Sequence, residues 1–304
     1  MNICVYGGLI TIMKKILALS LAALMALSVI GCSKKDDDTT GDDEGNKLQI
    51  VESTTTYENA TFSYRVNDEG RYDITSVKYN GIEKIDIKLP SDIDGIAVTG
   101  IASEAFKANT AIESVEIPSS ITKIGDWAFY QCISITEIKL PDSVKEIGKG
   151  AFWKCSGLSR LTLSSALTAI GDFAFMECTA LESVTIPANV KTIGDSAFYG
   201  CSKISEMVIP ASVEAIGRGA FLYCSALKTV TIENDAVVFP TKDVIAENGE
   251  PVKEPEGVFY ACHTDLVIKA ATESTTKAYV DAMNKGVTDN NKIDFESTDP
   301  TPAE

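Results

Sequence analysis

Six cysteines share one register of this sequence and are its first candidates for chemistry. They are Cys132, Cys155, Cys178, Cys201, Cys224 and Cys262, the first five spaced 23 residues apart and the last 38. Thiols one structural unit apart would lie near disulfide distance, but side chains in one column point the same way, which gives poor S–S torsions. We therefore expect buried free thiols that act as small apolar residues. Disulfides remain the alternative for an exported protein.

Cys262 and His263 are adjacent and superficially resemble a nucleophile with its base. Neighbours on an extended segment point to opposite faces, whereas a working pair needs hydrogen-bond reach and an orienting third group. His263 is also the only histidine in the chain, which excludes sites built from two histidines.

Three aspartates, Asp126, Asp172 and Asp195, recur at one register and could suggest calcium. Lys149 and Arg218 interrupt this column, and the clustered oxygen ligands that calcium requires are missing. We expect a solvated face there. No nucleophile, base and orienting group converge elsewhere, so we expect a non-enzymatic protein with no catalytic residue, metal or cofactor.

These residues must be positioned by a repeating unit, because the apolar positions around them keep the same period of 23 residues. The unit reads Ile-Gly-x-x-Ala-Phe-x-x-Cys-x-x-Leu-x-x-Val-x-Ile-Pro, with Asn109 in the cysteine column of the first copy. One unit cannot bury its own apolar face. Stacked copies can, at about 4.8 Å per rung, with phenylalanine lying on phenylalanine.

This unit resembles the leucine-rich repeats of the BspA-like class of bacterial surface proteins, over residues 99–232. The resemblance implies an α/β solenoid: a right-handed superhelix of short parallel strands with a helical step at each Ala-Phe pair. It also implies adhesion to proteins of a host or a neighbouring cell.

The flanking segments predict the ends of the solenoid. Alternating polar and apolar residues predict a β-rich N-terminal cap, and prolines and acids predict an inserted loop before the last repeat. The expected divisions are a cap at 48–98, repeats at 99–232, the loop at 233–257, a last partial repeat with a small C-terminal cap at 258–296, and a disordered tail at 297–304. Within the last cap we expect a helix around 277–285 and a final strand at 292–295.

The N-terminus predicts export. Lys14 and Lys15 precede an apolar run too short to span a bilayer comfortably, so residues 1–31 are predicted to be a signal peptide. The following Val-Ile-Gly-Cys resembles the lipobox of bacterial lipoproteins, which implies acylation of Cys32. A plain signal peptide with an incidental cysteine is the alternative.

Residues 32–47 are polar and charged, which predicts an acidic flexible tether. The run Ser-Lys-Lys-Asp-Asp-Asp at 33–38 is similar to the export signal of Bacteroidetes-type lipoproteins. That similarity implies a protein exported, lipid-anchored to the outer membrane and exposed at the cell surface.

Two faces of the solenoid are candidates for binding. After the repeat phenylalanine runs a column that includes Tyr130, Trp153, Met176 and Tyr199; such a stripe could stack on sugars or anchor a protein, or simply cover the core as a half-exposed ridge. The strand face presents Glu116, Lys139, Thr162 and Thr185. It is mixed and extended, and suits a macromolecular ligand better than a catalytic pocket.

The net charge of the chain limits the classes of partner that it can bind. A net charge of −16 repels nucleic acid and anionic membrane surfaces, so contact with the membrane is expected through the lipid anchor alone. Adhesion to a protein of a host or neighbouring cell, by a monomer, is the first hypothesis. A glycan-binding accessory lipoprotein of a polysaccharide-utilisation system is the second, and a purely architectural envelope protein the third.

Overall fold

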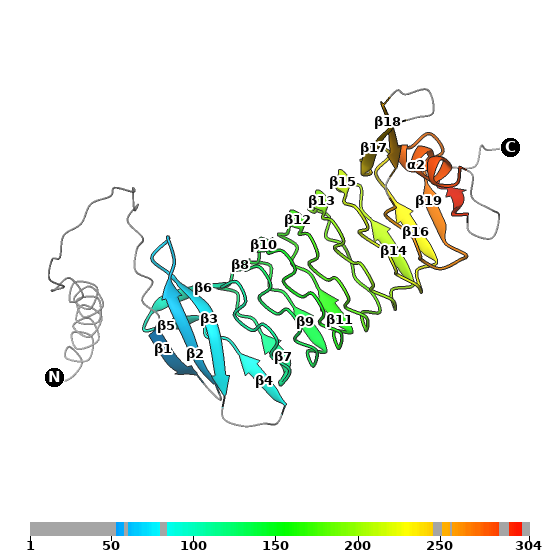
Figure 1. Cartoon of the computed structure of the whole chain (residues 1–304). Helices are drawn as coiled ribbons and strands as arrows, with labels where there is room; N and C mark the ends of the chain where they lie inside the picture. The colour runs from blue at the N-terminus through cyan, green and yellow to red at the C-terminus, as the bar shows by residue number, and fades with distance from the viewer. Residues whose placement is uncertain are drawn as a thin grey trace, which may run out of the picture.

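The structure is a computed structural model that describes residues 53–57, 60–79, 84–245, 251–255, 257–285 and 292–299. The predicted signal peptide, the lipidation site Cys32 and the tether at 32–47 lie outside these residues. The described part is an elongated solenoid in which each repeat forms one rung (Figure 1). A typical rung has three sides: a longer strand, a short strand and a run of turns.

The longer strands form one side of the solenoid, which we call the strand face. Parallel pairs join rungs at the repeat interval, as in Arg160↔Glu137 and Thr229↔Glu206. One sheet holds β4 (Ile85–Lys88), β7 (Ile112–Glu116), β9 (Glu137–Lys139) and β11 (Arg160–Thr162). The other holds β14 (Glu206–Ile209), β16 (Thr229–Ile232), β19 (Val267–Ala270) and β20 (Asp294–Ser297). The rung between them is joined to β11 by a single bridge, Arg160↔Ser183.

Short strands ending at the Ile-Gly pairs form the second side. They are β8 (Lys123–Ile124), β10 (Glu146–Ile147), β12 (Ala169–Ile170), β13 (Thr192–Ile193) and β15 (Ala215–Ile216). The glycine after each isoleucine is required by close approach: a Cβ on Gly125 would lie 2.4 Å from the main-chain nitrogen of Ser103 in the neighbouring rung.

The third side, which we call the turn side, corrects part of the expected fold class. A helical step was predicted at each Ala-Phe pair, but the segment is a series of turns in which Trp127 and Gln131 have φ values of 52° and 59°. The equivalent residues of the other rungs from Glu104 to Tyr223 are left-handed as well. A left-handed residue on each side of Ala-Phe-x ends any right-handed helix within one turn. Among the described residues the only α-helix is α2 (Thr275–Met283), beyond the repeats, so the solenoid is built from strands and turns.

The turn side is nevertheless hydrogen-bonded from rung to rung. The main-chain N–H groups of Trp127, Phe129 and Gln131 donate to carbonyl oxygens of the next rung at 2.9, 2.7 and 2.8 Å. Alternate N–H groups close turns within their own rung, as Tyr130 does on the carbonyl of Trp127 at 3.0 Å. The turn side is therefore as regularly spaced as the strand face.

Antiparallel strands lie at the N-terminal end. β1 (Ser53–Tyr57), β2 (Ala60–Val66) and β3 (Tyr72–Tyr79) form a meander, and β3 pairs in parallel with β6 (Ile96–Ile101). β5 (Asp92–Ile93) folds back on β6 in an antiparallel pair. Through β6 and β8 this sheet continues into the short-strand side of the solenoid.

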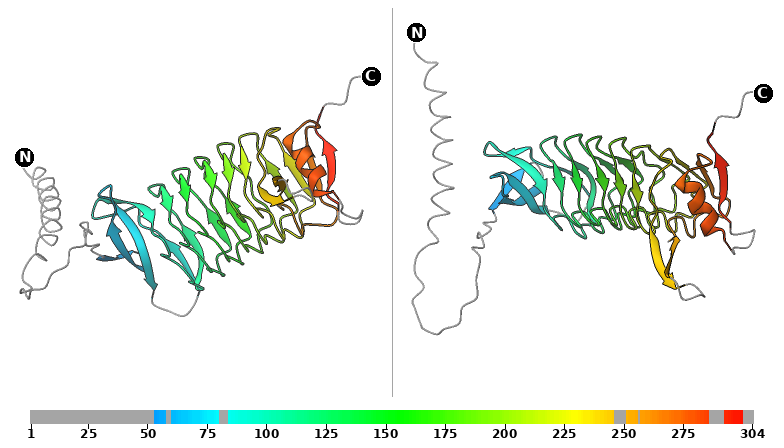
Figure 2. Two further views of the ribbon diagram at one scale, coloured as in Figure 1. Left: turned by 45° about the horizontal axis from the view of Figure 1, so that its top comes forward. Right: turned by 90° about the horizontal axis from the view of Figure 1, so that it is seen from above.

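The inserted segment contains a hairpin where a loop was expected. β17 (Thr241–Ile245) pairs antiparallel with β18 (Pro251–Pro255), and the hairpin projects sideways from the solenoid (Figure 2). Prolines suggested a loop because they cannot donate to a ladder, but they are tolerated in an edge strand of a two-stranded hairpin. The repeat register continues as far as Val238, which bridges to Ala215, so the departure begins after that residue.

The C-terminal end packs α2 against the last rung. Ser274 caps the helix by accepting a hydrogen bond from the N–H of Lys277 at 3.2 Å. The Tyr279 ring stacks on Phe239 at 4.2 Å, and its hydroxyl accepts a hydrogen bond from the N–H of Val258 at 2.8 Å.

A column of stacked phenylalanines forms the centre of the core. Ring centroids of neighbouring rungs lie 4.8 to 5.5 Å apart, and most of the rings are nearly parallel. The column holds Phe106, Phe129, Phe152, Phe175, Phe198, Phe221 and Phe259, none more than 2% exposed.

Candidate functional site

The cysteine column lies beside the phenylalanines, buried except for the half-buried Cys262, and the six thiols are free. Each Sγ donates to the main-chain oxygen of the phenylalanine one rung earlier, at 3.0 to 3.2 Å, as Cys132 does to Phe106. Burial raises the pKa of the Cys132, Cys201 and Cys262 thiols to about 12. Such thiols stay protonated at neutral pH and are poor nucleophiles.

Cys262 and His263 do not form a pair. The thiol of Cys262 donates to the carbonyl of Phe221 at 3.1 Å, while His263 Nδ1 accepts a hydrogen bond from the N–H of Asp265 at 3.0 Å. The two side chains are therefore engaged by different parts of the backbone.

The aspartate column joins neighbouring rungs. Asp126 Oδ1 accepts from the N–H of Lys149 at 2.8 Å, Asp172 Oδ1 from that of Asp195 at 2.9 Å, and Asp195 Oδ1 from that of Arg218 at 2.7 Å. Each carboxylate thus satisfies a main-chain donor of the next rung. Within the described residues, no group of histidine, cysteine or acidic side chains is arranged to hold a metal ion.

On the strand face, the predicted residues Glu116, Lys139, Thr162 and Thr185 are all exposed. Charges here are largely paired between rungs: Glu116 lies 3.5 Å from Lys88, and Arg160 lies 2.9 Å from Glu137. Such exposed pairs contribute little stability, and they neutralise part of the charge of this face.

On the turn side, the predicted stripe is half-buried. Tyr130, Trp153, Met176 and Tyr199 occupy successive rungs as expected, and each side chain is only partly exposed. The Tyr130 ring meets Trp153 edge-on at 5.3 Å. Lys107 Nζ lies 5.9 Å from the centre of the Tyr130 ring, a cation–π distance.

Two further aromatic residues of the turn side, Phe173 and Tyr223, were missed from the sequence, whereas Tyr260 belongs to the predicted stripe column. Phe173 stacks on Trp153 at 5.9 Å, and Tyr223 meets Tyr199 edge-on at 5.2 Å. Tyr223 and Tyr260 are 47% and 63% exposed, well above the stripe around them. Phe173 and Tyr223 lie in the two left-handed columns, whose residue types vary from rung to rung, so no periodic signal marks them.

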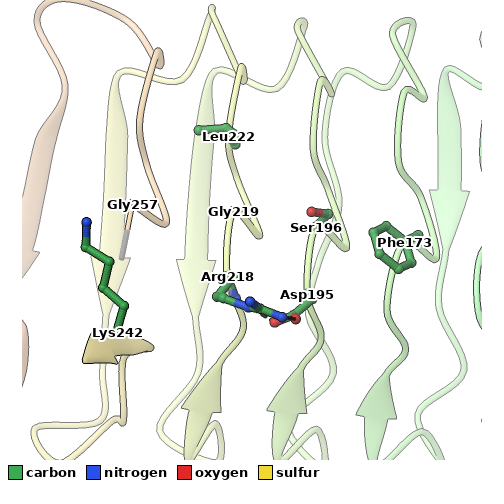
Figure 3. Close-up of a pocket in the computed structure, with 8 residues that line it drawn as sticks. All are labelled: Phe173, Asp195, Ser196, Arg218, Gly219, Leu222, Lys242 and Gly257. Atoms are coloured by element: carbon green, nitrogen blue, oxygen red, sulfur yellow. Dashed lines mark hydrogen bonds and ion pairs between the residues drawn. The ribbon is translucent and has the colours of Figure 1, made fainter. Parts of the chain in front are cut away.

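A groove of about 470 Å³ lies next to the projecting hairpin (Figure 3). Its lining includes Leu222, which directly precedes Tyr223, and Gly257, where an added Cβ would lie 3.2 Å from Tyr260 Cβ. The column of residues equivalent to Trp127 decreases in size along the groove, from Phe173 through Ser196 to Gly219 and Gly257, which leaves the later rungs without side chains. We call it the hairpin groove. Its remaining lining residues are Asp195, Arg218, Leu222 and Lys242.

The chemistry of the hairpin groove suits recognition. Asp195 Oδ2 accepts hydrogen bonds from Nε and the terminal nitrogen of Arg218 at 3.1 and 2.9 Å. Phe173 and Leu222 add apolar surface, and Lys242 on β17 adds a cation (Figure 3). Mixed apolar and charged surface of this kind is common at protein interfaces.

Comparison with known proteins agrees with this architecture. Residues 99–228 match, in six copies, the family described as BspA type leucine rich repeat region. No curated protein matches the chain.

Solved structures of bacterial repeat proteins are similar to the chain. A leucine-rich repeat protein of T. pallidum is 28% identical, with 68% of this chain and 78% of that chain covered and a TM-score of 0.45. A leucine rich cell surface protein from Faecalibacterium prausnitzii is 25% identical, with 73% and 71% covered and a TM-score of 0.48. A leucine-rich repeat protein from Bacteroides ovatus is 17% identical, with 71% and 70% covered and a TM-score of 0.39.

Proposed function

Because residues 99–228 are a BspA-type leucine-rich repeat region, we propose that this protein acts by binding another protein, as a non-enzymatic adhesion or interaction module at the cell surface. Repeat architecture supplies a large, regular surface but does not by itself select a ligand. The partner we propose is a protein of a host or neighbouring cell, bound by a monomer of this chain.

The proposal places the module outside the cell on a lipid anchor. It rests on what the sequence before the described residues predicts: a signal peptide at 1–31, acylation at Cys32 and an acidic tether at 32–47. Among the described residues, no helix is long and apolar enough to cross a membrane. The anchor is proposed to sit in the outer membrane, with the solenoid facing outward.

We choose the turn side as the binding face because of two exposed tyrosines near the hairpin groove. Among the described residues, Tyr223 and Tyr260 are the two most exposed aromatic side chains. Tyr199 packs against Tyr223. Tyrosine is enriched at interfaces because it offers a large, rigid contact area with a polar tip. Together with the mixed surface of the groove, these residues form the proposed protein-binding face.

The strand face serves as the matched comparison. It has the same rung spacing and equally exposed side chains, but Thr162 and Thr185 are small and its charges are neutralised by its own neighbours. Small side chains and solvent-exposed ion pairs contribute little to the free energy of binding. We therefore do not expect this face to bind the partner.

A bead-adhesion assay tests this proposal. Beads carrying the full chain in mild detergent are counted on cultured epithelial cells and on bacterial cells, before and after the cells are treated with trypsin or with periodate, which oxidises glycans. We expect trypsin to remove binding and periodate to leave it. The variant Tyr223→Ala/Tyr260→Ala should bind markedly less, and Thr162→Ala/Thr185→Ala should bind as the unchanged protein does.

Two outcomes would overturn the proposal. Binding that survives trypsin shows that the ligand is not a protein. Binding lost in the threonine variant and kept in the tyrosine variant shows that the strand face, rather than the turn side, makes the contact. Circular dichroism of each variant confirms that the solenoid is intact.

A further inference from the structure

A second groove, of about 400 Å³, crosses four rungs in the N-terminal half of the repeats. It lies between one left-handed column and the residues that follow the cysteine column, and we call it the edge groove. Two of its lining residues are apolar, Ala108 and the 47% exposed Ile133. The other six have polar side chains: Thr110, Gln131, Lys154, Ser156, Glu177 and Thr179.

The edge groove is locally neutral in a strongly acidic protein. Lys154 Nζ lies 4.0 Å from Glu177 Oε2, and both side chains are about one-third exposed. Since the chain as a whole has a net charge of −16, an acidic ligand is repelled over long range. The groove itself offers a cation, a carboxylate, an amide and three hydroxyl groups to a neutral ligand.

The main-chain donors of the left-handed column in the groove are already occupied. The N–H groups of Gln131, Lys154 and Glu177 donate to carbonyl oxygens of Trp153, Met176 and Tyr199 at 2.8, 2.8 and 2.7 Å. A peptide added as an extra strand along this column would need such main-chain donors. Recognition along this column therefore falls to the side chains, and these bonds fix the spacing of the three side chains to that of the rungs.

Trp153 connects the edge groove to the aromatic stripe. Its indole Nε1 donates to Glu177 Oε1 at 3.3 Å, and Lys154 Nζ lies 5.7 Å from its ring centre. Two charged side chains that line the groove are thus held against one tryptophan. An aromatic ring beside fixed hydrogen-bonding groups is the combination that binds a sugar ring, which has apolar C–H faces and hydroxyl edges.

We propose that the edge groove binds a neutral, linear oligosaccharide. Gln131, Lys154 and Glu177 hydrogen-bond the sugar hydroxyls at successive rungs, and Trp153 lies against the side chains of Lys154 and Glu177. A regularly repeating groove suits a ligand that itself repeats along its length. This site goes beyond the proposed protein-binding function: it uses different rungs and a different class of ligand.

Tryptophan fluorescence can test the site directly. The chain has two tryptophans, Trp127 and Trp153, and the variant Trp127→Phe leaves Trp153 as the only reporter. The full chain with this substitution is titrated with soluble neutral polysaccharides (mannan, xyloglucan, dextran) and with acidic ones (heparin, chondroitin sulfate). We expect a saturable change in emission with at least one neutral polysaccharide and none with the acidic ones.

Variants then locate the ligand. In the same background, Gln131→Ala should weaken the apparent affinity by about tenfold or more, because a site built around hydrogen bonds loses a specific partner. Thr185→Ala, on the strand face and outside the groove, should leave the affinity unchanged. Thermal unfolding followed by circular dichroism checks that both variants are folded, and calorimetry repeats the titrations without relying on the indole.

The proposal is overturned if neither fluorescence nor calorimetry shows saturable binding of any neutral polysaccharide in the panel. It is also overturned if an acidic polysaccharide binds equally well, or if Gln131→Ala binds like the unchanged protein. These results are separable from adhesion, because the bead assay depends on Tyr223 and Tyr260 and on trypsin-sensitive targets.

Discussion

At the scale of single residues, the thiols of the cysteine column show how a potential nucleophile becomes a structural group. Desolvation disfavours the thiolate, and the carbonyl one rung earlier accepts a hydrogen bond from the protonated form. The sequence predicts the column because its spacing is regular. Spacing says nothing about the acceptor, which is supplied by the backbone of a different rung.

Stability should therefore fall at alkaline pH. The Cys132, Cys201 and Cys262 thiols have pKa values raised from 9.0 to about 12 in the folded protein. Below pH 9 both states keep these protons and the thiols cause no pH dependence. Between about pH 9 and 12 only the unfolded state releases them, so each thiol lowers the free energy of unfolding by about 1.4 kcal/mol per pH unit.

Urea unfolding of the full chain at about pH 8 and about pH 10 measures this slope. Cys201→Ser lacks one thiol and should lose less stability over that interval, by the contribution of a single group. Tyr279, whose pKa is also raised by burial to about 12, is present in both proteins and cancels in the comparison. Equal slopes in the two proteins would show that the Cys201 thiol does not titrate as the buried geometry requires.

At the scale of elements, the phenylalanine column makes neighbouring rungs depend on one another. Phe175 stacks between Phe152 at 5.4 Å and Phe198 at 5.5 Å. Phe175→Ala should cost about 3 to 5 kcal/mol of unfolding free energy, because the cavity opens between two rings that the rung backbone holds apart. Phe106 stacks on the single ring of Phe129. Phe106→Ala should lower the unfolding free energy by less, since the chain around an end rung relaxes more easily.

Chemical unfolding of Phe175→Ala and Phe106→Ala measures both costs, with Tyr223→Ala as a surface control. Equal losses at the two phenylalanines would contradict a core whose strength depends on neighbours on both sides.

Elements were predictable from the sequence only where side-chain burial selects the residue type. The columns of Phe129 and Cys132 face the core, so every rung repeats them. The left-handed positions at Trp127 and Gln131 are set by backbone geometry at the surface, where many residue types are tolerated, and the expected helical step was wrong for that reason. The hairpin β17–β18 was missed because its prolines resemble those of a loop.

At the scale of the whole molecule, the sequence predicts which residues share a face but not the shape of that face. A period of 23 residues places Tyr130 and Trp153 on one side. The hairpin groove arises from the absence of side chains at Gly219 and Gly257 and from Lys242 on a hairpin outside the repeat. Such features depend on neighbouring rungs being stacked, and a single repeat does not contain them.

Attachment to a membrane is also a property of the whole molecule, and Cys32 decides it. Cells expressing the full chain are fed labelled palmitate and extracted with a detergent that separates into two phases. We expect the protein to carry label and to enter the detergent phase, since each buried methylene contributes about 0.8 kcal/mol and several acyl chains hold far more firmly than one.

The variant Cys32→Ser should carry no label, whereas Cys262→Ser, altered in the solenoid, should behave as the unchanged protein. Label on the Cys32→Ser protein would show that Cys32 is not the acylated residue. Cleavage of the unchanged protein without label would show that residues 1–31 are a plain signal peptide and that the solenoid has no lipid anchor.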